Sequence, residues 1–182
     1  MEKYRMIGPN GHPVKRHPPI RSRAAPGQRR PGCSTRFAAI GSDPAPGPPL
    51  YLDTSAVLRA TIENGTLPAI ERRIRSARVL VSSRLSLVES CRALIRLRAL
   101  GVAGEDRLAD AERDIAAIWA RCELWEITRR VCEMACEVAH GRVLRALDAI
   151  HLATFALARR ELEGLELLTV DERLRASVGG TP

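Results

Sequence analysis

Four acidic residues that are far apart in the chain each lie at the edge of an apolar run, and their carboxylates are groups that can do chemistry. They are Asp53, Glu89, Asp148 and Asp171. Asp53 and Asp171 directly end short apolar runs that have the length of buried strands. An acid at the end of a buried strand lies where open α/β sheets build their sites. If the fold brings the four carboxylates together, they form a pocket that holds a divalent metal ion.

Such a pocket suits the hydrolysis of a phosphodiester, which is an anion that another anion, hydroxide, must attack. A hard divalent cation such as Mg²⁺ or Mn²⁺ neutralises the phosphate and acidifies a bound water molecule. Carboxylate oxygens are suitable ligands for these ions, whereas thiolates are not. Without the metal, clustered carboxylates repel one another and take up protons. The four acids therefore predict a metal-dependent nuclease.

Each acid also has a plainer interpretation when it is taken alone. Asp53 and Asp171 can cap the helices that follow them, and a glutamate on a helix, such as Glu89, is usually solvated. Asp148 differs because it lies between apolar residues of a helical pattern, where an acid needs a partner. Asp53 and Asp148 are therefore the best supported metal ligands. Asp171 is expected to bind through water or to hold a second metal ion.

Three polar side chains near the acids are candidates for supporting roles. Thr169 lies two residues before Asp171 and on a strand points to the same side, so its hydroxyl can bond a carboxylate or the attacking water. Ser55 can do the same, although a cap for the following helix is the favoured interpretation. His151 follows Asp148 by one turn, and a histidine titrates near physiological pH, which suits a general base. A packed, hydrogen-bonded histidine is the favoured interpretation.

Substrate binding is assigned to arginines expected at the rim of the acidic site. The candidates are Arg84, Arg92, Arg96 and Arg145. The whole chain contains two tyrosines, two phenylalanines and two tryptophans. A platform of aromatic rings that stacks single-stranded bases is therefore poorly supported.

Strand-like and helix-like patterns alternate after residue 49, and they must position the acids. Strands are predicted at residues 50–53, 78–82, 123–127 and 167–170, the third of them at a sheet edge. Helices are predicted at residues 56–63, 69–76, 84–100, 105–121, 129–140, 145–160 and 172–178. This alternation predicts a parallel sheet covered by helices.

Several helix ends and one helix face carry more detailed signals. Thr54 or Ser55 is expected to cap the first helix, and Thr128 the fifth. Gly101 and Gly141 are expected to end the helices that precede them. The helix at 84–100 is expected to bury a stripe formed by Leu87, Cys91, Leu94, Ile95 and Leu97.

The composition suits one folded domain. The chain has 182 residues, of which 45% are hydrophobic, as in ordinary globular domains. No apolar run approaches the roughly 20 residues that a membrane helix requires. The first residues also lack the apolar core of a signal peptide. The expected location is therefore the cytoplasm.

The formal charge of +8 at pH 7 is unevenly distributed. Residues 1–49 contain nine Lys and Arg against two acidic residues, whereas residues 50–182 contain 20 against 19. Residues 1–49 also contain 10 of the 12 prolines, so they are expected to be a disordered leader. A solvated or untranslated leader is favoured over a basic arm that binds nucleic acid. The predicted organisation is therefore a leader at 1–49 and one domain at 50–182.

The cysteines give no sign of a disulfide framework or a zinc site. Their number is odd and no two of them form a C-x-x-C pair; they are Cys33, Cys91, Cys122, Cys132 and Cys136. Cys132 and Cys136 have helical spacing, but no paired histidines complete a zinc site. We interpret the cysteines as thiols of the core or of helix faces.

The four acids lie in four short segments, Tyr51–Ala56, Ser86–Glu89, Ala146–Ala153 and Leu168–Leu174. These segments resemble the motifs of PIN domains, in particular those of VapC-type toxins from VapBC toxin–antitoxin pairs. Each segment is a weak signal by itself, whereas all four in this order and at these distances are specific. The resemblance covers about residues 50–178.

The resemblance implies a three-layer α/β/α domain around a parallel sheet of four to five strands. It implies RNA cleavage with Mg²⁺ or Mn²⁺ held by Asp53, Glu89, Asp148 and Asp171. It also implies a homodimer and inhibition by a small VapB-type antitoxin encoded beside the toxin. One feature departs from the family, which usually has a further edge strand after the last acid. Only about ten residues follow Asp171, so this strand is expected to be missing or very short.

Two alternatives remain open. A non-catalytic PIN module would bind RNA or a protein partner without cutting, but it has no need of four converging carboxylates. A phosphoaspartate domain would use Asp53 as its nucleophile or acceptor. In that case Ser55 stands where a dehalogenase-type site has a second acid, and the receiver type needs a downstream lysine, whereas none follows Lys15. The metal-dependent nuclease is the favoured function.

Overall fold

Short apolar runs form the strands of one sheet, and the amphipathic runs between them form helices. The computed structural model describes residues 47–63, 68–139 and 143–178. The predicted leader lies outside the described residues up to residue 46, and so does the predicted helix break at Gly141.

The order of the elements follows the predicted alternation. The four strands are β1 (Leu50–Leu52), β2 (Leu80–Ser83), β3 (Cys122–Trp125) and β4 (Glu166–Leu168). The helices of the described residues are α1 (Thr54–Ile62), α2 (Pro68–Ser76), α3 (Leu85–Leu100), α4 (Glu105–Trp119), α5 (Arg129–Glu137), α6 (Ala146–Glu161) and α7 (Glu172–Ser177). Every predicted strand and helix is therefore present, with bounds that differ by a few residues.

The sheet is parallel and has the strand order β3-β2-β1-β4. In register, Tyr51 of β1 lies between Val81 of β2 and Leu167 of β4. The chain therefore builds strands outward on one side of β1 and then returns to add β4 on the other side. The place where the strand order reverses is the switch point at which open α/β sheets build their sites. The predicted parallel sheet and the edge position of β3 are confirmed.

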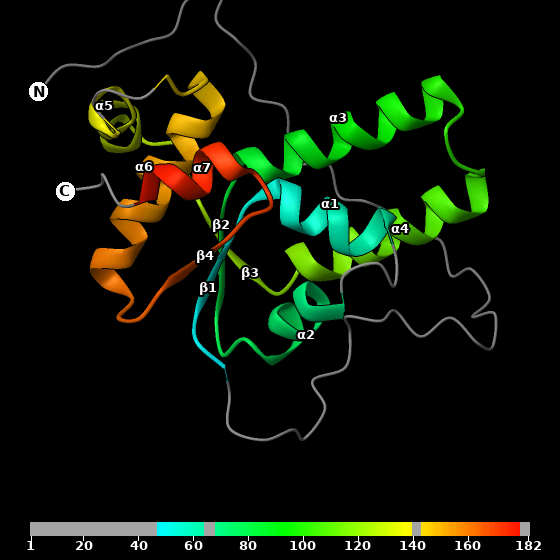
Figure 1. Ribbon diagram of the computed structural model, residues 1–182, viewed down its shortest axis with the longest axis horizontal. Helices are drawn as coiled ribbons and strands as arrows, with labels where there is room; N and C mark the ends of the chain where they lie inside the picture. The colour runs from blue at the N-terminus through cyan, green and yellow to red at the C-terminus, as the bar shows by residue number, and fades with distance from the viewer. Residues whose placement is uncertain (1–46, 64–67, 140–142, 179–182) are drawn as a thin grey trace, which may run out of the picture. The chain divides into compact units, whose positions relative to one another are not determined.

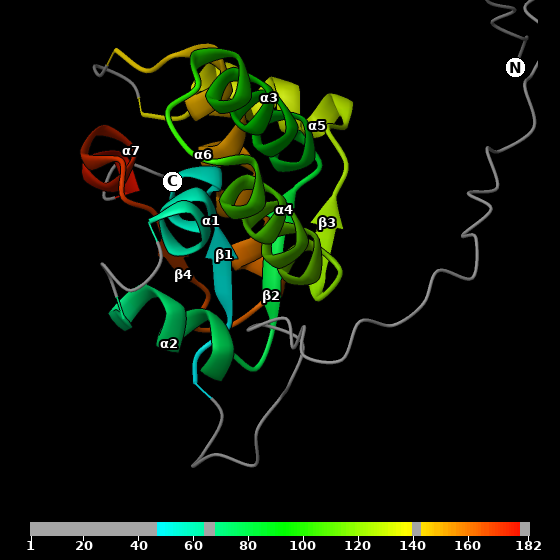
Figure 2. The same ribbon diagram turned by 90° about the vertical axis from the view of Figure 1, so that its right-hand side faces the viewer.

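Alternate residues of the strands point to opposite faces of the sheet, and each face is covered by helices. Leu50, Leu52 and Leu80 belong to a core formed with α1 to α4. Tyr51 and Val81 belong to a second core formed with α5, α6 and α7. Figure 1 shows the two groups of helices on either side of the strands, and Figure 2 looks onto α1, α3 and α4 with the sheet behind them. The predicted three-layer α/β/α arrangement is confirmed.

Gly47 lies three residues before β1 and pairs with the segment that follows α2. The Gly47 N–H donates to the carbonyl of Ser76 at 2.8 Å, and the Arg78 N–H donates to the carbonyl of Gly47 at 3.2 Å. A Cβ atom at position 47 would lie 3.1 Å from the Ser76 oxygen, which is tighter than ordinary packing allows. Glycine therefore permits the close approach of the two backbones at this point.

Three local predictions were wrong in detail. Helix α1 is capped by Asp53, whose side chain accepts a hydrogen bond from the Ser55 N–H, and not by Thr54 or Ser55. Helix α5 ends at Glu137, three residues early, because Val138 leaves the helical conformation and Ala139 has a positive φ of 54°.

The third difference concerns the face of α3 that is buried. Leu94 is buried as predicted, and Leu87 and Leu97 pack against the core, but Cys91 and Ile95 are exposed. Helix α3 instead buries Ser86 and Ser90. Their hydroxyl groups are satisfied by Ser82 and by the α3 backbone, so small polar side chains can line this contact at little cost. In the described residues, no helix is long and apolar enough to cross a membrane.

Candidate active site

The four acids lie at the carboxyl edge of the sheet, around the switch point between β1 and β4. Asp53 follows β1 and Asp171 follows β4. Asp148 is in the first turn of α6, and Glu89 is in the second turn of α3. The acids therefore come from both helical layers and from the two strands at the switch point (Figure 1).

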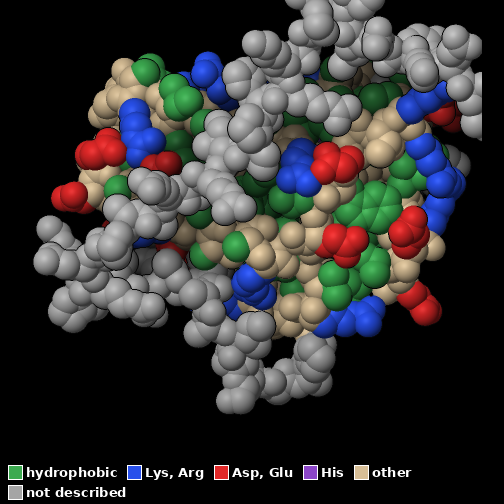
Figure 3. All heavy atoms as spheres, turned by 180° about the vertical axis from the view of Figure 1, so that it is seen from behind, with side chains coloured by type: hydrophobic (Ala, Val, Ile, Leu, Met, Phe, Trp, Pro, Cys, Tyr) green, Lys and Arg blue, Asp and Glu red, His purple; other side chains and the backbone are tan. Residues whose placement is uncertain are grey.

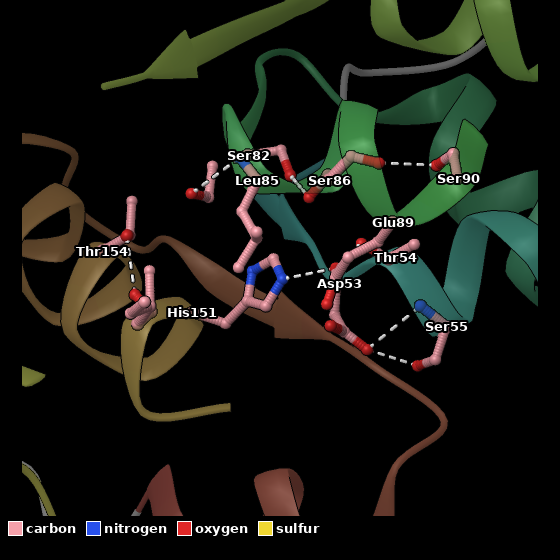
Figure 4. A network of polar contacts seen from close by, with 12 residues as sticks. Asp53, Thr54, Ser55, Ser82, Leu85, Ser86, Glu89, Ser90, His151 and Thr154 are labelled. Carbon is pink, nitrogen blue, oxygen red and sulfur yellow. Dashed lines mark hydrogen bonds and ion pairs between the residues drawn. The ribbon is translucent and has the colours of Figure 1, made fainter. Parts of the chain in front are cut away.

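Asp53 is buried, with 6% of its surface exposed, and its carboxylate is held by neighbouring hydroxyl groups. Oδ2 accepts hydrogen bonds from the Ser55 N–H at 3.2 Å, from the Ser55 hydroxyl, and from the Thr169 hydroxyl at 2.8 Å. Figure 4 shows the bonds from Ser55 to this carboxylate. Ser55 and Thr169 therefore fix the orientation of Asp53, and Ser55 does so in place of the cap that was predicted for it.

Thr169 also connects Asp53 to Asp171. The Asp171 N–H donates to the Thr169 hydroxyl oxygen at 3.0 Å. The Asp171 side chain caps α7, because its Oδ1 accepts from the backbone N–H groups of Arg173 at 2.7 Å and Leu174 at 3.1 Å. Asp171 thus has the helix-capping geometry that was its alternative interpretation, while one of its oxygens takes no part in the cap.

Glu89 is held by a second set of donors. Its Oε2 accepts a hydrogen bond from the Thr54 hydroxyl at 2.5 Å and lies 2.9 Å from His151 Nε2. Figure 4 shows Glu89 between the imidazole of His151 and the start of α1. Burial raises the pKa of Glu89, but the hydrogen bonds from His151 and Thr54 outweigh it, so this pKa lies below its ordinary value. Glu89 is therefore an ionised carboxylate at neutral pH.

Asp148 has the opposite electrostatic environment. Burial raises its pKa, and the nearby charges of Asp171 and Asp53 raise it further. Arg145 opposes this rise through a backbone hydrogen bond and through its charge. Asp148 is thus close enough to Asp171 and Asp53 for their charges to disfavour its ionisation, which is the condition under which a cation would stabilise the ionised form.

The donor chemistry fits a hard divalent cation, although the carboxylates are not gathered into a preformed metal cage. Among residues 47–63, 68–139 and 143–178, no three Asp, Glu, His or Cys side chains are arranged to hold a metal ion. In this part of the chain, the side-chain hydrogen bonds of Asp53, Glu89 and Asp171 each use a single carboxylate oxygen. Each carboxylate therefore has a second oxygen outside these bonds. Oxygen ligands are those that Mg²⁺ and Mn²⁺ prefer.

The predicted rim arginines differ in their surroundings. Arg145 directly precedes α6 and acts on Asp148, whereas Arg92 and Arg96 are exposed along α3. Arg84 forms an ion pair with Glu126, its Nε lying 2.9 Å from Oε1. On the face that Figure 3 shows, basic and acidic side chains are interspersed. Of the four candidates, Arg145 is the one that the described contacts tie to the acidic site.

Two residues that contact the site, Thr54 and Tyr51, were not assigned a role in it from the sequence. Thr54 bonds Glu89, and the hydroxyl oxygen of Tyr51 lies 3.0 Å from His151 Nδ1. A signal for Tyr51 existed, because a tyrosine inside a buried strand needs a partner for its hydroxyl group. The packed, hydrogen-bonded state favoured for His151 matches its geometry, since it is only 2% exposed and both ring nitrogens have partners.

Together, the fold and the site define the class of α/β/α domains that carry an acidic centre at the switch point of a parallel sheet. Comparison with known proteins is more specific. The model of the PIN domain family matches residues 50–178, so the chain belongs to the PIN domain family.

Curated relatives are ribonucleases of the VapC group. The chain is 31% identical over 126 residues to Ribonuclease VapC46 of Mycobacterium tuberculosis (strain ATCC 25618 / H37Rv), and the aligned part makes up 69% of this chain and 87% of that relative. It is 36% identical over 128 residues to Ribonuclease VapC49 of the same strain, covering 70% and 87%. The crystal structure of PAE2754 from Pyrobaculum aerophilum has the same fold, with a TM-score of 0.51 and 23% identity over 72% of this chain and 81% of that one.

Proposed function

We propose that this chain is the ribonuclease toxin of a VapBC-type toxin–antitoxin pair and hydrolyses RNA phosphodiester bonds with Mg²⁺ or Mn²⁺. The observation that carries the proposal is the placement of four acids, Asp53, Glu89, Asp148 and Asp171, around the switch point of the sheet, where Asp171 and Asp53 raise the pKa of Asp148. A scaffold gains nothing from placing these carboxylates at one edge of the sheet, whereas a metal site requires acids there. The similarity to VapC ribonucleases over most of the chain supports the same activity.

The four acids are assigned different parts of one metal site. Asp53 and Asp148 are its main ligands, because Asp53 follows an inner strand of the sheet and Asp148 faces the charges of Asp171 and Asp53, which raise its pKa. Glu89 would contribute Oε1, which its hydrogen bonds do not use, and Asp171 would act directly or through water. When bound, the metal ion supplies charge for the phosphate and a more acidic water molecule.

The chain's own residues orient these groups. Ser55 and Thr169 hold the Asp53 carboxylate from one side, so that its other oxygen has a fixed direction. Arg145 carries a positive charge beside Asp148 and is the first candidate for a contact with an RNA phosphate, with Arg84, Arg92 and Arg96 further candidates. The proposed partners are RNA, a VapB-type antitoxin and a second copy of the chain, and the proposed location is the cytoplasm.

The direct test is RNA cleavage by the purified protein as a function of Mg²⁺ or Mn²⁺ concentration. We expect Asp53→Asn and Asp148→Asn each to abolish metal-dependent cleavage while the protein stays folded. Asp106→Asn is the matched control, since it removes an exposed aspartate from α4, outside the acidic site. Wild-type protein that binds RNA but does not cut it would contradict the proposal and support the non-catalytic alternative. Full cleavage by the double variant Asp53→Asn/Asp148→Asn would contradict the assignment of the site.

The toxin role has its own test in cells. Expression of the wild-type chain should arrest growth, and expression together with the neighbouring reading frame should relieve the arrest. Asp53→Asn should be harmless at the same level of protein. Unimpeded growth at a high level of wild-type protein would contradict the toxin role without affecting the assignment of the nuclease.

A further inference from the structure

A buried line of polar side chains runs from the centre of the sheet to Glu89. The Tyr51 hydroxyl lies 3.0 Å from His151 Nδ1, and His151 Nε2 lies 2.9 Å from Glu89 Oε2. The Thr54 hydroxyl donates to the same oxygen of Glu89. Tyr51 is fully buried, and His151 is 2% exposed. The line joins residues of β1, α6 and α3, which come from all three layers of the domain.

The chemistry of these groups fixes the direction of the hydrogen bonds. An ionised carboxylate only accepts, so His151 Nε2 must carry the hydrogen that faces Glu89. In the neutral imidazole Nδ1 is then an acceptor, and the Tyr51 hydroxyl supplies its donor. The opposite tautomer would place a lone pair of Nε2 against the carboxylate. Tyr51 therefore selects the tautomer of His151 that binds Glu89.

Aromatic packing holds this arrangement in place. The rings of Tyr51 and His151 meet edge to face, with centroids 6.2 Å apart and an interplanar angle of 79°. The ring of Phe155, one turn after His151 on α6, packs against Tyr51 at 5.7 Å and 70°. Such contacts contribute about 0.5–1.5 kcal/mol beyond burial of the rings. His151 is thus closed off from RNA and bulk water, which argues against its use as a general base.

We propose that Tyr51 and His151 are positioning residues that, with Thr54, hold Glu89 Oε2 so that Oε1 is presented to the metal ion. This inference rests on the proposed function, since it concerns the same metal site. Two donors on one oxygen fix the plane of the carboxylate and leave its other oxygen for a ligand. The arrangement resembles the outer-shell contacts that orient metal ligands and tune their affinity. His151 also follows Asp148 by one turn of α6, so a single helix positions two of the four acids.

The test is the affinity for Mn²⁺, measured on the full-length protein without RNA by electron paramagnetic resonance or calorimetry. His151→Leu removes the donor to Glu89 and should weaken Mn²⁺ binding about 10- to 100-fold, as the loss of outer-shell partners does. His151→Gln retains an N–H donor at a similar distance from the backbone and should recover most of the affinity. Tyr51→Phe removes the donor to His151 Nδ1, so the imidazole is no longer held in one tautomer. Its Mn²⁺ affinity should lie between those of His151→Leu and His151→Gln.

Phe155→Leu is the matched control. It removes the aromatic contact with Tyr51 while leaving the hydrogen bonds of Glu89 in place, so it should lower the melting temperature but change the Mn²⁺ affinity by less than about threefold. Should His151→Leu fail to fold, the comparison of Tyr51→Phe and His151→Gln with Phe155→Leu decides the question.

The outcomes separate the two proposals. Wild-type protein that does not bind Mn²⁺ overturns both of them. If the wild-type protein binds Mn²⁺ and the Asp53→Asn variant does not, the metal site is supported. If in that case His151→Leu and Tyr51→Phe bind Mn²⁺ as tightly as Phe155→Leu does, the positioning role is overturned and the metal site stands.

Discussion

The hydroxyl group of Thr169 offers a sharp test of how the acidic site is held together. It donates to Asp53 Oδ2 at 2.8 Å and accepts from the Asp171 N–H at 3.0 Å. Thr169 is 4% exposed, so water cannot easily replace it. The substitution Thr169→Val keeps the shape of the side chain and removes both of these hydrogen bonds, together with the 3.2 Å contact between the Thr169 and Ser55 hydroxyl groups.

The size of the effect can be worked out from these contacts. A hydrogen bond to a charged group contributes about 1.5–3 kcal/mol. We take the lower end, because Ser55 continues to hold the same oxygen of Asp53. Loss of the hydrogen bond from the Asp171 N–H adds about 0.5 kcal/mol to this cost, since Asp171 is half-buried and water can take the place of the hydroxyl. The total of about 2 kcal/mol corresponds to a fall in melting temperature of roughly 8 °C for a domain of about 130 residues.

The assay is thermal and urea unfolding with and without Mg²⁺, on Thr169→Val and two controls. Thr169→Ser retains the hydroxyl and should unfold close to the wild type. Thr61→Val removes another buried hydroxyl, whose hydrogen bonds go only to carbonyls of its own helix, Val57 at 2.9 Å and Leu58 at 3.4 Å. The substitution Thr61→Val should lower the free energy of unfolding by less than about 0.5 kcal/mol. Equal melting temperatures for Thr169→Val and Thr61→Val would refute the reasoning.

Three further predictions concern single groups of the domain. Because the pKa of Asp148 is raised by burial and by its acidic neighbours, this side chain is more often protonated in the folded protein than in the unfolded chain between the ordinary value of about 3.9 and the raised one. Urea unfolding in EDTA should therefore show the wild type gaining stability relative to Asp148→Asn as the pH falls through this window, a comparison that cancels the opposite contribution of Glu89, whose pKa is lowered; parallel pH profiles of the two proteins would contradict it. Gly101 ends α3 with a φ of 60°, so Gly101→Ala should lower the free energy of unfolding by about 1 kcal/mol, whereas no loss would contradict the assigned backbone. Burial raises the pKa of Cys122 to about 12, so mass spectrometry after brief alkylation at pH 8 should find Cys122 unmodified and a reaction at the exposed Cys91, Cys132 and Cys136; early modification of Cys122 would contradict its burial.

Much of the fold followed from local signals in the sequence. The apolar runs before Asp53 and Asp171 predicted the strands of the switch point, because a buried parallel strand is apolar on both faces. Thr128 and Gly101 predicted helix ends, since a side-chain cap and a left-handed residue act within one turn. Thr128 caps the start of α5 and Gly101 ends α3, as expected.

What could not be predicted depends on contacts between distant residues. The exposure of Ile95 follows from which side of α3 meets its neighbours, and a helical pattern alone does not determine this. The hydrogen bond between Tyr51 and His151 joins residues 100 positions apart. Asp53 was expected to act as a ligand or as a cap, and it caps α1 while its carboxylate is also held by Thr169. Only the assembled sheet brings that hydroxyl to it.

The most direct test of the metal site is a crystal of the wild-type protein soaked in Mn²⁺, with the ion located by its anomalous scattering. We predict a peak bound by carboxylate oxygens of Asp53 and Asp148, and its loss in crystals of Asp148→Asn. A peak away from both residues, or no peak for a protein that still cleaves RNA in Mn²⁺, would contradict the assignment of these acids as the metal site.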